Sequence, residues 1–344
     1  MKRNVIVKQK SILDRNKKMK SGIFSDFFDE FNLLERKKLF LQKTINTNLL
    51  TEWQAIEVLH DDLFMIAAVF KFGKMNRTLL VVYDRVNDTL EDFSSSSYLT
   101  DISVVAPTLK HKSMSIRETK GTKVKILNEL DKNRLYLKGN AHDLKFDIVF
   151  NRIAKPVVIS LPMSKQHSVY TEKDLLTPSG YIQYKGKDYV LSSRNITILD
   201  DHRGYYPLSS GYDWFTCLGD IKHNGEFKKF AINLTHFYKN LNKEVTENGF
   251  WLNETFYFLP DVTFERDKDV WVIKDQEGRV HLKYHVYQKV SVDKKSVLTI
   301  DYKLGFGYVS GYIKTLEGDM ITLDKMFALG EKRLSKTPLK SPYQ

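Results

Sequence analysis

The sequence, 344 residues long, has little of several features that mark common protein classes. It contains one cysteine, Cys217, which permits neither an intramolecular disulfide nor a cysteine-based zinc site. Its 17 Gly and 8 Pro residues are too few for a collagenous or low-complexity chain. The longest apolar run, Leu63 to Phe70, is too short to span a bilayer, and the amino-terminal residues lack the apolar stretch of a secretion signal. These absences predict a soluble protein of a reducing compartment, the cytoplasm.

Sequence motifs of several enzyme classes are missing as well. The chain has no GxxxxGK[ST] loop, no GxGxxG after a strand, no HExxH and no GxSxG. Gly305, Gly307 and Gly311 lie between strand-like runs, which indicates bulges or close packing and not a phosphate loop. His281 and His285 would face the same side of a strand, too far apart to bind one metal ion. We therefore expect neither a metal nor a cofactor.

Large side chains that favour β-strands are abundant instead. The sequence has 18 Tyr, 21 Phe and 4 Trp, and 42% of its residues are apolar, which is enough for sizeable cores. Asp29 to Gln42 has apolar residues among charges at a spacing that allows one short helix. From Glu52 onward, runs rich in Val, Ile, Tyr, Phe and Thr are bounded by turn residues and predict strands. These runs are Trp53 to His60, Leu63 to Phe72, Arg77 to Asp84, Met114 to Thr119, Lys123 to Asn128, Arg134 to Lys138, Leu144 to Phe150, Gly180 to Leu199, Phe227 to Phe237, Gly249 to Phe258, Val262 to Arg266, Val270 to Lys274, Arg279 to Val292, Ser296 to Leu304 and Tyr308 to Leu316.

The runs form two sets, which predicts two antiparallel β-barrel or sandwich domains preceded by a short helix. Strands and helices do not alternate, so a parallel doubly wound sheet or a TIM barrel is disfavoured. Pro156, Pro162 and Pro178 interrupt the chain after the first set, which places the domain boundary near residues 155 to 180. The expected organisation is a basic flexible leader over 1–22, domains over 23–175 and 176–335, and a tail over 336–344.

Positive charge is concentrated at the amino terminus. The chain has 54 Lys and Arg residues against 42 Asp and Glu, and residues 1 to 20 hold eight of the basic residues with Asp14 as their only acid. Such a leader is either a solvated, mobile terminus or an anchor for anionic lipid headgroups, which would make the protein peripheral to a membrane. The rest of the chain is close to charge balance, which argues against nucleic acid as a partner.

One segment, residues 195 to 218, combines polar and aromatic residues in a pattern that suggests a site. Ile196 to Leu199 is a predicted apolar strand that delivers the polar run Asp200 to Arg203 to a bend at Gly204. The next residues, Tyr205, Tyr206, Tyr212 and Trp214, would surround this run with aromatic surface.

The polar run allows two interpretations. Beside aromatic walls the ionised form of Asp201 is desolvated and its pKa is raised, while the adjacent His202 or Arg203 can orient it, so that it can donate a proton at neutral pH. Alternatively, Asp201 and Arg203 form an ion pair that pins the turn between the domains, with Tyr205 and Trp214 as core residues.

Two further polar positions stand out among apolar neighbours. Thr246-Glu247-Asn248 precedes an apolar run and either caps a loop or contributes to a site. Asn233, between Ile232 and Leu234 in a predicted strand, would face the opposite way from both and need a hydrogen-bond partner if it points inward.

These motifs resemble those of a bacterial family called domain of unknown function 2804. The resemblance covers roughly residues 20 to 335. It rests on Leu199 to Pro207 with Tyr212-Asp213-Trp214, on Ile232-Asn233-Leu234, Thr246-Glu247-Asn248 and Gly307 to Gly311, and on Glu52-Trp53-Gln54 and Val82-Tyr83-Asp84 in the first half of the chain.

More distantly, Asp201-His202 resembles the Asp-His pair of a lipocalin-like, two-domain superfamily that includes carotenoid hydratases and some natural-product cyclases. The resemblance implies two lipocalin-like β-barrels and an apolar ligand bound near their junction. In the enzyme that it implies, Asp201 is a general acid that His202 orients, with Arg203 beside them. The ligand would meet Asp200, Tyr205, Tyr206, Tyr212, Asp213, Trp214, Asn233, Glu247 and Asn248.

Two classes of function therefore remain. The first is an enzyme that hydrates, cyclises or isomerises a lipid-like or polyene-like molecule by acid chemistry. The second is a non-catalytic carrier that binds the same apolar small molecule.

Overall fold

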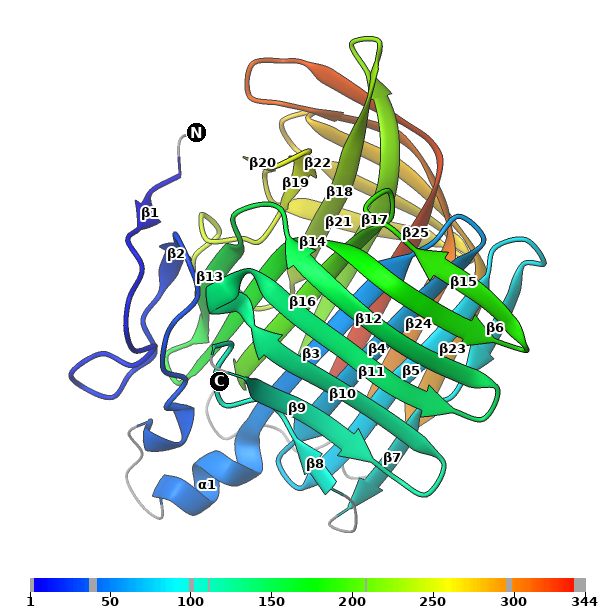
Figure 1. The fold of residues 1–344 in the computed structure, drawn as a ribbon. Coiled ribbons are helices and arrows are strands. Elements are labelled where there is room, and N and C mark those ends of the chain that lie inside the picture. The colour runs from blue at the N-terminus through cyan, green and yellow to red at the C-terminus, as the bar shows by residue number, and fades with distance from the viewer. Residues whose placement is uncertain are drawn as a thin grey trace. The chain divides into compact units, whose positions relative to one another are not determined.

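The computed structural model describes residues 3–36, 42–98, 102–110, 112–207, 209–294 and 299–336. Strands dominate, and nearly all of them pair antiparallel in two sheets (Figure 1). This confirms the predicted class, a mainly β protein of two antiparallel domains with a short helix near the amino terminus.

The chain divides into two compact units. The amino-terminal unit comprises Lys2–Leu161 and Ser168–Tyr205, and the carboxy-terminal unit comprises Pro162–His167 and Tyr206–Gln344. This division lies further along the chain than the expected boundary near residues 155 to 180. The reason is that the strand crossing residue 178 pairs with strands on both sides in the first sheet, and proline does not end it.

The first sheet has 16 strands, with the order β6-β5-β4-β3-β16-β14-β12-β11-β10-β9-β8 along its main path. The elements as far as Tyr205 are β1 (Val5–Ile6), β2 (Gly22–Phe24), the 3-10 helix η1 (Leu33–Glu35), α1 (Gln42–Leu49), β3 (Leu50–Leu59), β4 (Leu63–Phe72), β5 (Met75–Asp84), β6 (Thr89–Asp92), β7 (Ser95–Tyr98), β8 (Ile102–Val104), β9 (Ser113–Glu118), β10 (Thr122–Glu129), the 3-10 helix η2 (Leu130–Lys132), β11 (Arg134–Ala141), β12 (Leu144–Arg152), β13 (Val157–Ser164), β14 (His167–Tyr184), β15 (Lys187–Leu191) and β16 (Ile196–Tyr205).

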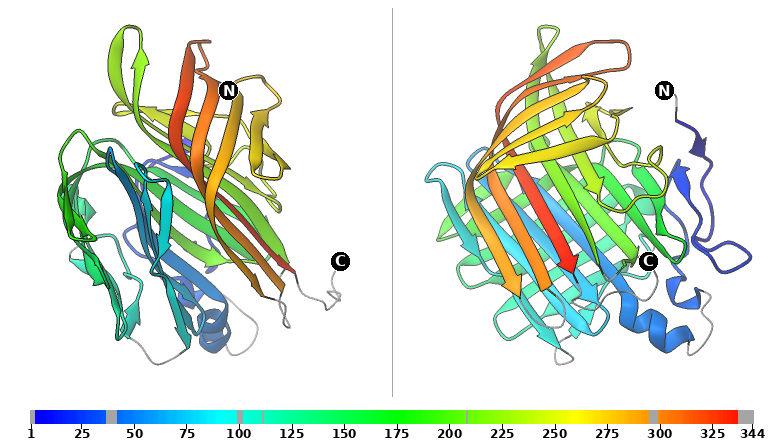
Figure 2. Two further views of the ribbon diagram at one scale, coloured as in Figure 1. Left: turned by 90° about the vertical axis from the view of Figure 1, so that its right-hand side faces the viewer. Right: turned by 180° about the vertical axis from the view of Figure 1, so that it is seen from behind.

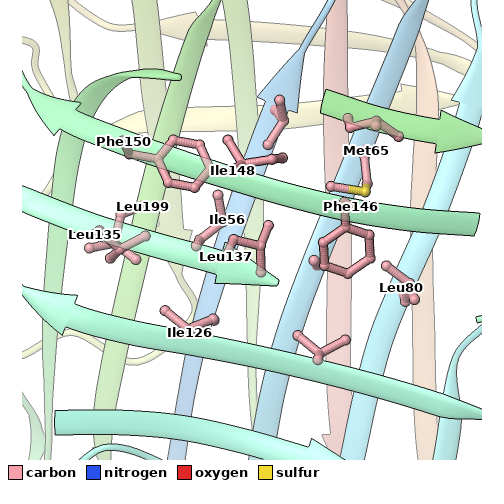
Figure 3. Packing of buried hydrophobic residues seen from close by; sticks show 14 of the residues in the cluster. Ile56, Met65, Leu80, Ile126, Leu135, Leu137, Phe146, Ile148, Phe150 and Leu199 are labelled. Carbon is pink, nitrogen blue, oxygen red and sulfur yellow. The ribbon is translucent and has the colours of Figure 1, made fainter. Parts of the chain in front are cut away.

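The amino-terminal core lies where this sheet folds back on itself. Strands β9 to β12 cross over β3 to β5, and apolar side chains from both layers form a cluster between them (Figures 1 and 3). Ile56 and Met65 from one layer meet Leu137 and Phe146 from the other (Figure 3). Because successive side chains of a strand point to opposite faces, every second residue of these strands faces this core.

The second sheet has nine strands in the order β20-β19-β18-β17-β25-β24-β23-β22-β21, and it curls around a separate core (Figure 2). The largest side chains of that core are Phe215, Phe230, Phe250, Trp271 and Tyr284. The strands are β17 (Ser210–His223), β18 (Glu226–Phe237), β19 (Gly249–Leu252), β20 (Thr255–Phe258), β21 (Val262–Asp267), β22 (Val270–Asp275), β23 (Val280–Lys294), β24 (Thr299–Lys314) and β25 (Met320–Lys336).

Two details of the strands differ from the sequence predictions. The predicted runs Ser296 to Leu304 and Tyr308 to Leu316 are not separate strands: residues 296 to 298 lie outside the described part, and most of the rest forms one strand, β24. Gly307 lies between the two runs, where the backbone of β23 approaches so closely that a Cβ would lie 1.8 Å from the carbonyl oxygen of His285. Pro178 lies inside β14, at the gap between the residues that pair with β16 and those that pair with β15, where a missing N–H costs little.

The helix lies later than expected. It forms over Gln42–Leu49 and not over Asp29 to Gln42, of which residues 37 to 41 lie outside the described part. Within the described residues, no helix is long and apolar enough to cross a membrane.

The amino-terminal residues are packed, in contrast to the expected flexible leader. Ile12 and Leu13 are buried in a cluster with Phe28, Tyr170 and Tyr205. Several of the leader's lysines also form ion pairs with an acidic stretch that follows. These pairs are Lys8 with Asp26 (3.1 Å), Lys10 with Glu30 (3.2 Å) and Lys17 with Glu35 (2.5 Å).

Candidate functional site

Strand β16 carries the polar run that the sequence singles out. The strand does not end in a bend after Leu199 but continues through Gly204 to Tyr205, and every residue in it is buried. It lies between β3 and β14 and pairs with both. Because consecutive side chains of a strand point to opposite faces, Asp201 and Arg203 lie on one face and Asp200 and His202 on the other.

On the first face, Asp201 is held by Arg203. The Nε and Nη2 atoms of Arg203 each donate to one carboxylate oxygen of Asp201 at 2.7 Å, and both side chains are fully buried. Nη1 of Arg203 donates to the carbonyl oxygen of Ala106 at 2.6 Å and lies 3.5 Å from Glu52. Burial raises the pKa of Asp201 against the opposing effect of Arg203. The structure therefore forms the predicted ion pair but does not bring His202 to Asp201.

A second buried group of charges lies beside this pair on β14. Glu172 accepts a hydrogen bond from the hydroxyl of Tyr170 at 2.5 Å and lies 3.3 Å from Nη2 of Arg152. Nε of Arg152 is 2.5 Å from Asp174, two residues further along the strand. Burial, together with the neighbouring Asp174, raises the pKa of Glu172 well above its ordinary value. Two carboxyl groups and one guanidinium thus occupy the interior of the amino-terminal unit.

The opposite face of the same strands holds a different polar group, which we call the Trp53 face: Trp53, Lys173, Asp200 and His202. The imidazole of His202 stacks on the indole of Trp53, with ring centroids 3.9 Å apart and planes 5° from parallel. The indole N–H of Trp53 donates to Asp200 at 3.2 Å, and the ammonium of Lys173 lies 2.7 Å from the same carboxylate. All four side chains are buried. Trp53 therefore contacts both Asp200 and His202.

Sequence reasoning missed several of these residues. Glu172, Lys173 and Asp174 form three consecutive charges within an apolar stretch from Val169 to Leu176, and a charged run inside a predicted strand is the signal that would have found them. No such signal marks Arg152, because it is the last residue of β12, where a charged residue is common.

The predicted aromatic and acidic residues of β17 lie in the carboxy-terminal unit. The hydroxyl of Tyr212 donates to Glu331 at 2.5 Å. Asp213, on the other face of the strand, accepts from the hydroxyl of Tyr238 at 2.9 Å and from Arg266 at 2.6 Å. Tyr212 and Asp213 thus have structural partners within their own unit.

The polar positions on β18 and the loop after it form one connected network. Asn233 accepts from the indole N–H of Trp214 at 2.7 Å and donates to the carbonyl oxygen of Glu247 at 3.2 Å. Asn248 accepts from the backbone N–H of Thr235 at 2.7 Å and donates to the carbonyl oxygen of Pro260. Asn233 therefore has the partner that its burial requires, and Asn248 ties the loop to β18.

Two more predicted residues, Tyr205 and Tyr206, contact cations. Tyr205 donates to the carbonyl oxygen of Leu33 at 2.8 Å and lies under the guanidinium of Arg36, 4.4 Å from its ring centroid. Arg333 lies 5.2 Å from the ring centroid of Tyr206.

Within the carboxy-terminal unit, a pocket of about 270 Å³ opens beside the β18 loop. Its lining includes His236, Lys243, Glu247 and Asp261. The carboxylate of Asp261, which lies 3.6 Å from Nδ1 of His236, raises the pKa of that imidazole. Among the residues that the structure describes, no three or more His, Cys, Asp and Glu side chains are placed to hold a metal ion.

The fold defines a two-domain, antiparallel β protein. The chain belongs to the family named Domain of unknown function (DUF2804), whose sequence model matches residues 6–336, and this confirms the resemblance seen in the motifs. A comparison with curated proteins finds no match.

Two solved structures have a similar fold. One is kievitone hydratase from Nectria haematococca, with a TM-score of 0.54 at 11% sequence identity, covering 83% of this chain and 88% of that one. The other is CghA in complex with Sch210972, with a TM-score of 0.54 at 9% identity, covering 97% of this chain and 99% of that one. At such low identity the similarity shows a shared fold.

Proposed function

We propose that the protein binds an apolar, unsaturated small molecule of the lipid or polyene kind and transfers protons to and from it, in hydration, cyclisation or isomerisation. The observation that carries the proposal is the Trp53 face, where Asp200 and His202 lie two residues apart on one face of β16 with Trp53 in contact with both. In this assignment the carboxylate that acts together with His202 is Asp200, and not Asp201 as the sequence predicts.

The chemistry of these side chains suits proton transfer. One nitrogen of a neutral imidazole carries a proton and the other can accept one, so His202 can both donate and accept a proton. In a hydration, His202 protonates one carbon of a double bond, water adds to the other carbon, and the proton that the water loses returns to the site. The carboxylate of Asp200 can stabilise the positive charge that develops between these steps.

The surroundings of the pair suit an apolar ligand. On the same face, the residues opposite one another on β4 and β3 are Phe70 with Trp53 and Ala68 with Ala55, so aromatic and small apolar side chains flank Asp200 and His202. The similarity in fold to a hydratase supports the proposal by analogy. It is an analogy and no more, because one fold can host unrelated functions.

The competing function is a non-catalytic carrier for the same class of ligand. It is favoured by the contacts of Asp200, because an ion pair with Lys173 and a hydrogen bond from Trp53 are also what a purely structural carboxylate would have. On this alternative, His202 and Trp53 form an aromatic wall and no proton moves.

Incubation in D2O separates the two functions even while the substrate is unidentified. The purified protein is mixed with an organic extract of its native cells, and mass spectrometry follows deuterium that becomes bound to carbon. An enzyme of the proposed kind labels one or a few apolar compounds. The variants His202→Gln and Asp200→Asn should lower the labelling rate by about a hundredfold or more.

Lys274→Gln is the matched control, because Lys274 on β22 is far from β16 in sequence and forms an exposed ion pair with Glu265 on β21. It should label at the wild-type rate. A protein that retains an extractable apolar compound through purification but labels nothing in D2O is a carrier, and that result would refute the catalytic proposal.

A further inference from the structure

A second candidate surface lies on strands β9 to β12, on the face that points away from the core. The core-facing residues of these strands are apolar, for example Val124, Ile126 and Leu137. Their neighbours in the chain therefore point outward. Two bands of residues on this outer face have opposite character, and neither band includes a residue of the Trp53 face.

The first, the lysine band, consists of Lys123, Lys125, Lys138 and Lys145. The register of the strands places Lys125 directly opposite Lys138, and it places Lys123 and Lys145 on either side of Asn140. Like charges directly across a strand pair destabilise a sheet. This arrangement therefore has a cost in folding that a negatively charged partner would relieve.

Acidic side chains near the lysine band neutralise only part of its positive charge. Lys123 lies 2.8 Å from Glu118 and Lys138 lies 2.6 Å from Asp147. Lys125 and Lys145 form no ion pair with any residue that the structure describes. A groove of about 810 Å³ lies over the band, and all four lysines line it together with His142 and Asp143 at the turn between β11 and β12.

The second, the apolar band, consists of Met114, Leu127, Tyr136 and Val149. These four residues lie directly opposite one another on β9, β10, β11 and β12, one row along from Lys125 and Lys138. All four are partly exposed.

Apolar residues also border the lysine band at both ends. On β8, Ile102 is 63% exposed and Val104 is 46% exposed, and on β15, Val190 is 70% exposed. The register aligns Val104 with Ile116 and Lys125 on one side, and Val190 with Tyr181 on the other. The outer face thus presents basic groups with apolar side chains around them.

We propose that this outer face docks on the surface of an anionic lipid bilayer. The ammonium groups of the lysine band would meet the phosphate and carboxylate groups of the lipid headgroups. The apolar band would enter the boundary between headgroups and acyl chains, where tyrosine is particularly favourable because one end of it is apolar and the other polar. Such docking would bring the protein to the phase in which apolar molecules are dissolved.

A bilayer suits this face better than a soluble anion or a nucleic acid does. A phosphorylated small molecule would pair with the lysines but would leave Leu127, Val149 and the exposed Val190 without a function. Nucleic acids likewise offer no apolar layer in which such side chains could be buried. The lysine band and the apolar band together fit a partner that offers both negative charge and an apolar layer.

Co-sedimentation of the full chain with vesicles tests the proposal. The vesicles contain three parts phosphatidylcholine to one part phosphatidylserine, and phosphatidylcholine alone serves as the neutral comparison. The double variant Lys125→Gln, Lys145→Gln should lower the partition coefficient on the anionic vesicles by about tenfold or more at low salt. Leu127→Ser should weaken binding that remains at high salt, where the attraction of the lysines is screened.

The matched control is Lys222→Gln, Lys283→Gln, which removes the same charge from two exposed lysines of the carboxy-terminal unit. It should bind the vesicles as the wild type does. Equal loss in both double variants would show that net charge alone governs binding and would overturn the proposal, as would failure of the wild type to sediment with anionic vesicles. Binding of inorganic pyrophosphate that needs Lys125 and Lys145, without binding to vesicles, would assign the groove to a soluble anion instead.

Discussion

The guanidinium of Arg203 holds both carboxylate oxygens of Asp201, with two donor atoms each at 2.7 Å. Its third nitrogen reaches the backbone of Ala106, 97 residues away in the chain. Its planar face also lies 4.3 Å from the ring centroid of Phe31 in the amino-terminal segment. This ion pair therefore connects β16 to two distant parts of the amino-terminal unit.

Replacing one member of this pair should destabilise the protein strongly. In Asp201→Asn the guanidinium remains buried without its carboxylate, and loss of one partner of a buried pair costs about 3 to 5 kcal/mol. We expect the free energy of unfolding, measured by urea denaturation, to fall by that amount. Lys274→Gln, which breaks an exposed pair, should change it by less than about 1 kcal/mol. If Asp201→Asn is as stable as this control, Asp201 is not a structural brace.

A pH dependence should arise from Glu172. Burial raises its pKa well above 4.5, so the folded protein keeps a proton that the unfolded chain releases above that pH. This contribution to stability is complete at low pH and is lost as the pH rises from about 4.5 toward the pKa of the folded state. Glu172→Gln, which cannot ionise, should gain in stability relative to the wild type over that range.

Urea unfolding of both proteins at a series of pH values measures this difference. The comparison isolates Glu172 together with Asp174 and Arg152, which interact with it, because the wild type and the variant share every other titratable group. A difference in the free energy of unfolding that stays constant with pH would show that Glu172 is ionised in the folded protein as it is in the unfolded one.

The fold was predictable from the sequence to a large extent because most strands have apolar residues in alternation. Leu63 to Phe72 and Val262 to Arg266 form strands within one residue of the predicted limits. Strand β14 was missed over most of its length and β17 was missed entirely, because charged residues, and Pro178 in β14, interrupt their apolar pattern. Pairing on both sides stabilises them there: β14 lies between β12 and β16, and β17 lies between β18 and β25.

The candidate site was predictable as a segment and not as a geometry. The sequence identifies Asp200 to Arg203, but which two of them share a face depends on whether the strand continues, and this run has low strand propensity. The register of β3, β16 and β14 places Trp53 and Lys173 beside Asp200. This register could not be predicted from the single sequence.

The amino-terminal segment should contribute to stability even though its charge pattern suggests a free terminus. Ile12 is fully buried, so Ile12→Ala removes apolar contacts and leaves a cavity, at a cost of about 2 to 5 kcal/mol. Val7, which is 76% exposed, is the control, and Val7→Ala should have almost no effect. Thermal unfolding followed by circular dichroism compares the two. Equal melting temperatures would show that the segment does not pack in solution.

Asn233 has either a structural or a ligand-binding role, and its substitution decides between them. Its side chain is 1% exposed and satisfies both the indole N–H of Trp214 and the carbonyl oxygen of Glu247. In Asn233→Ala these two groups lose their partner, at about 1 to 3 kcal/mol for each group that stays buried.

In the double variant Asn233→Ala, Trp214→Phe, the unsatisfied indole N–H is gone as well. If Trp214 and Asn233 form a structural pair, the two losses in the free energy of unfolding should be less than additive, by about 1 kcal/mol. If Asn233 is instead held in place for a ligand, Asn233→Ala should leave the stability of the ligand-free protein unchanged or raise it, because groups kept for binding often lower stability. Urea unfolding of the two single variants and the double variant distinguishes these roles.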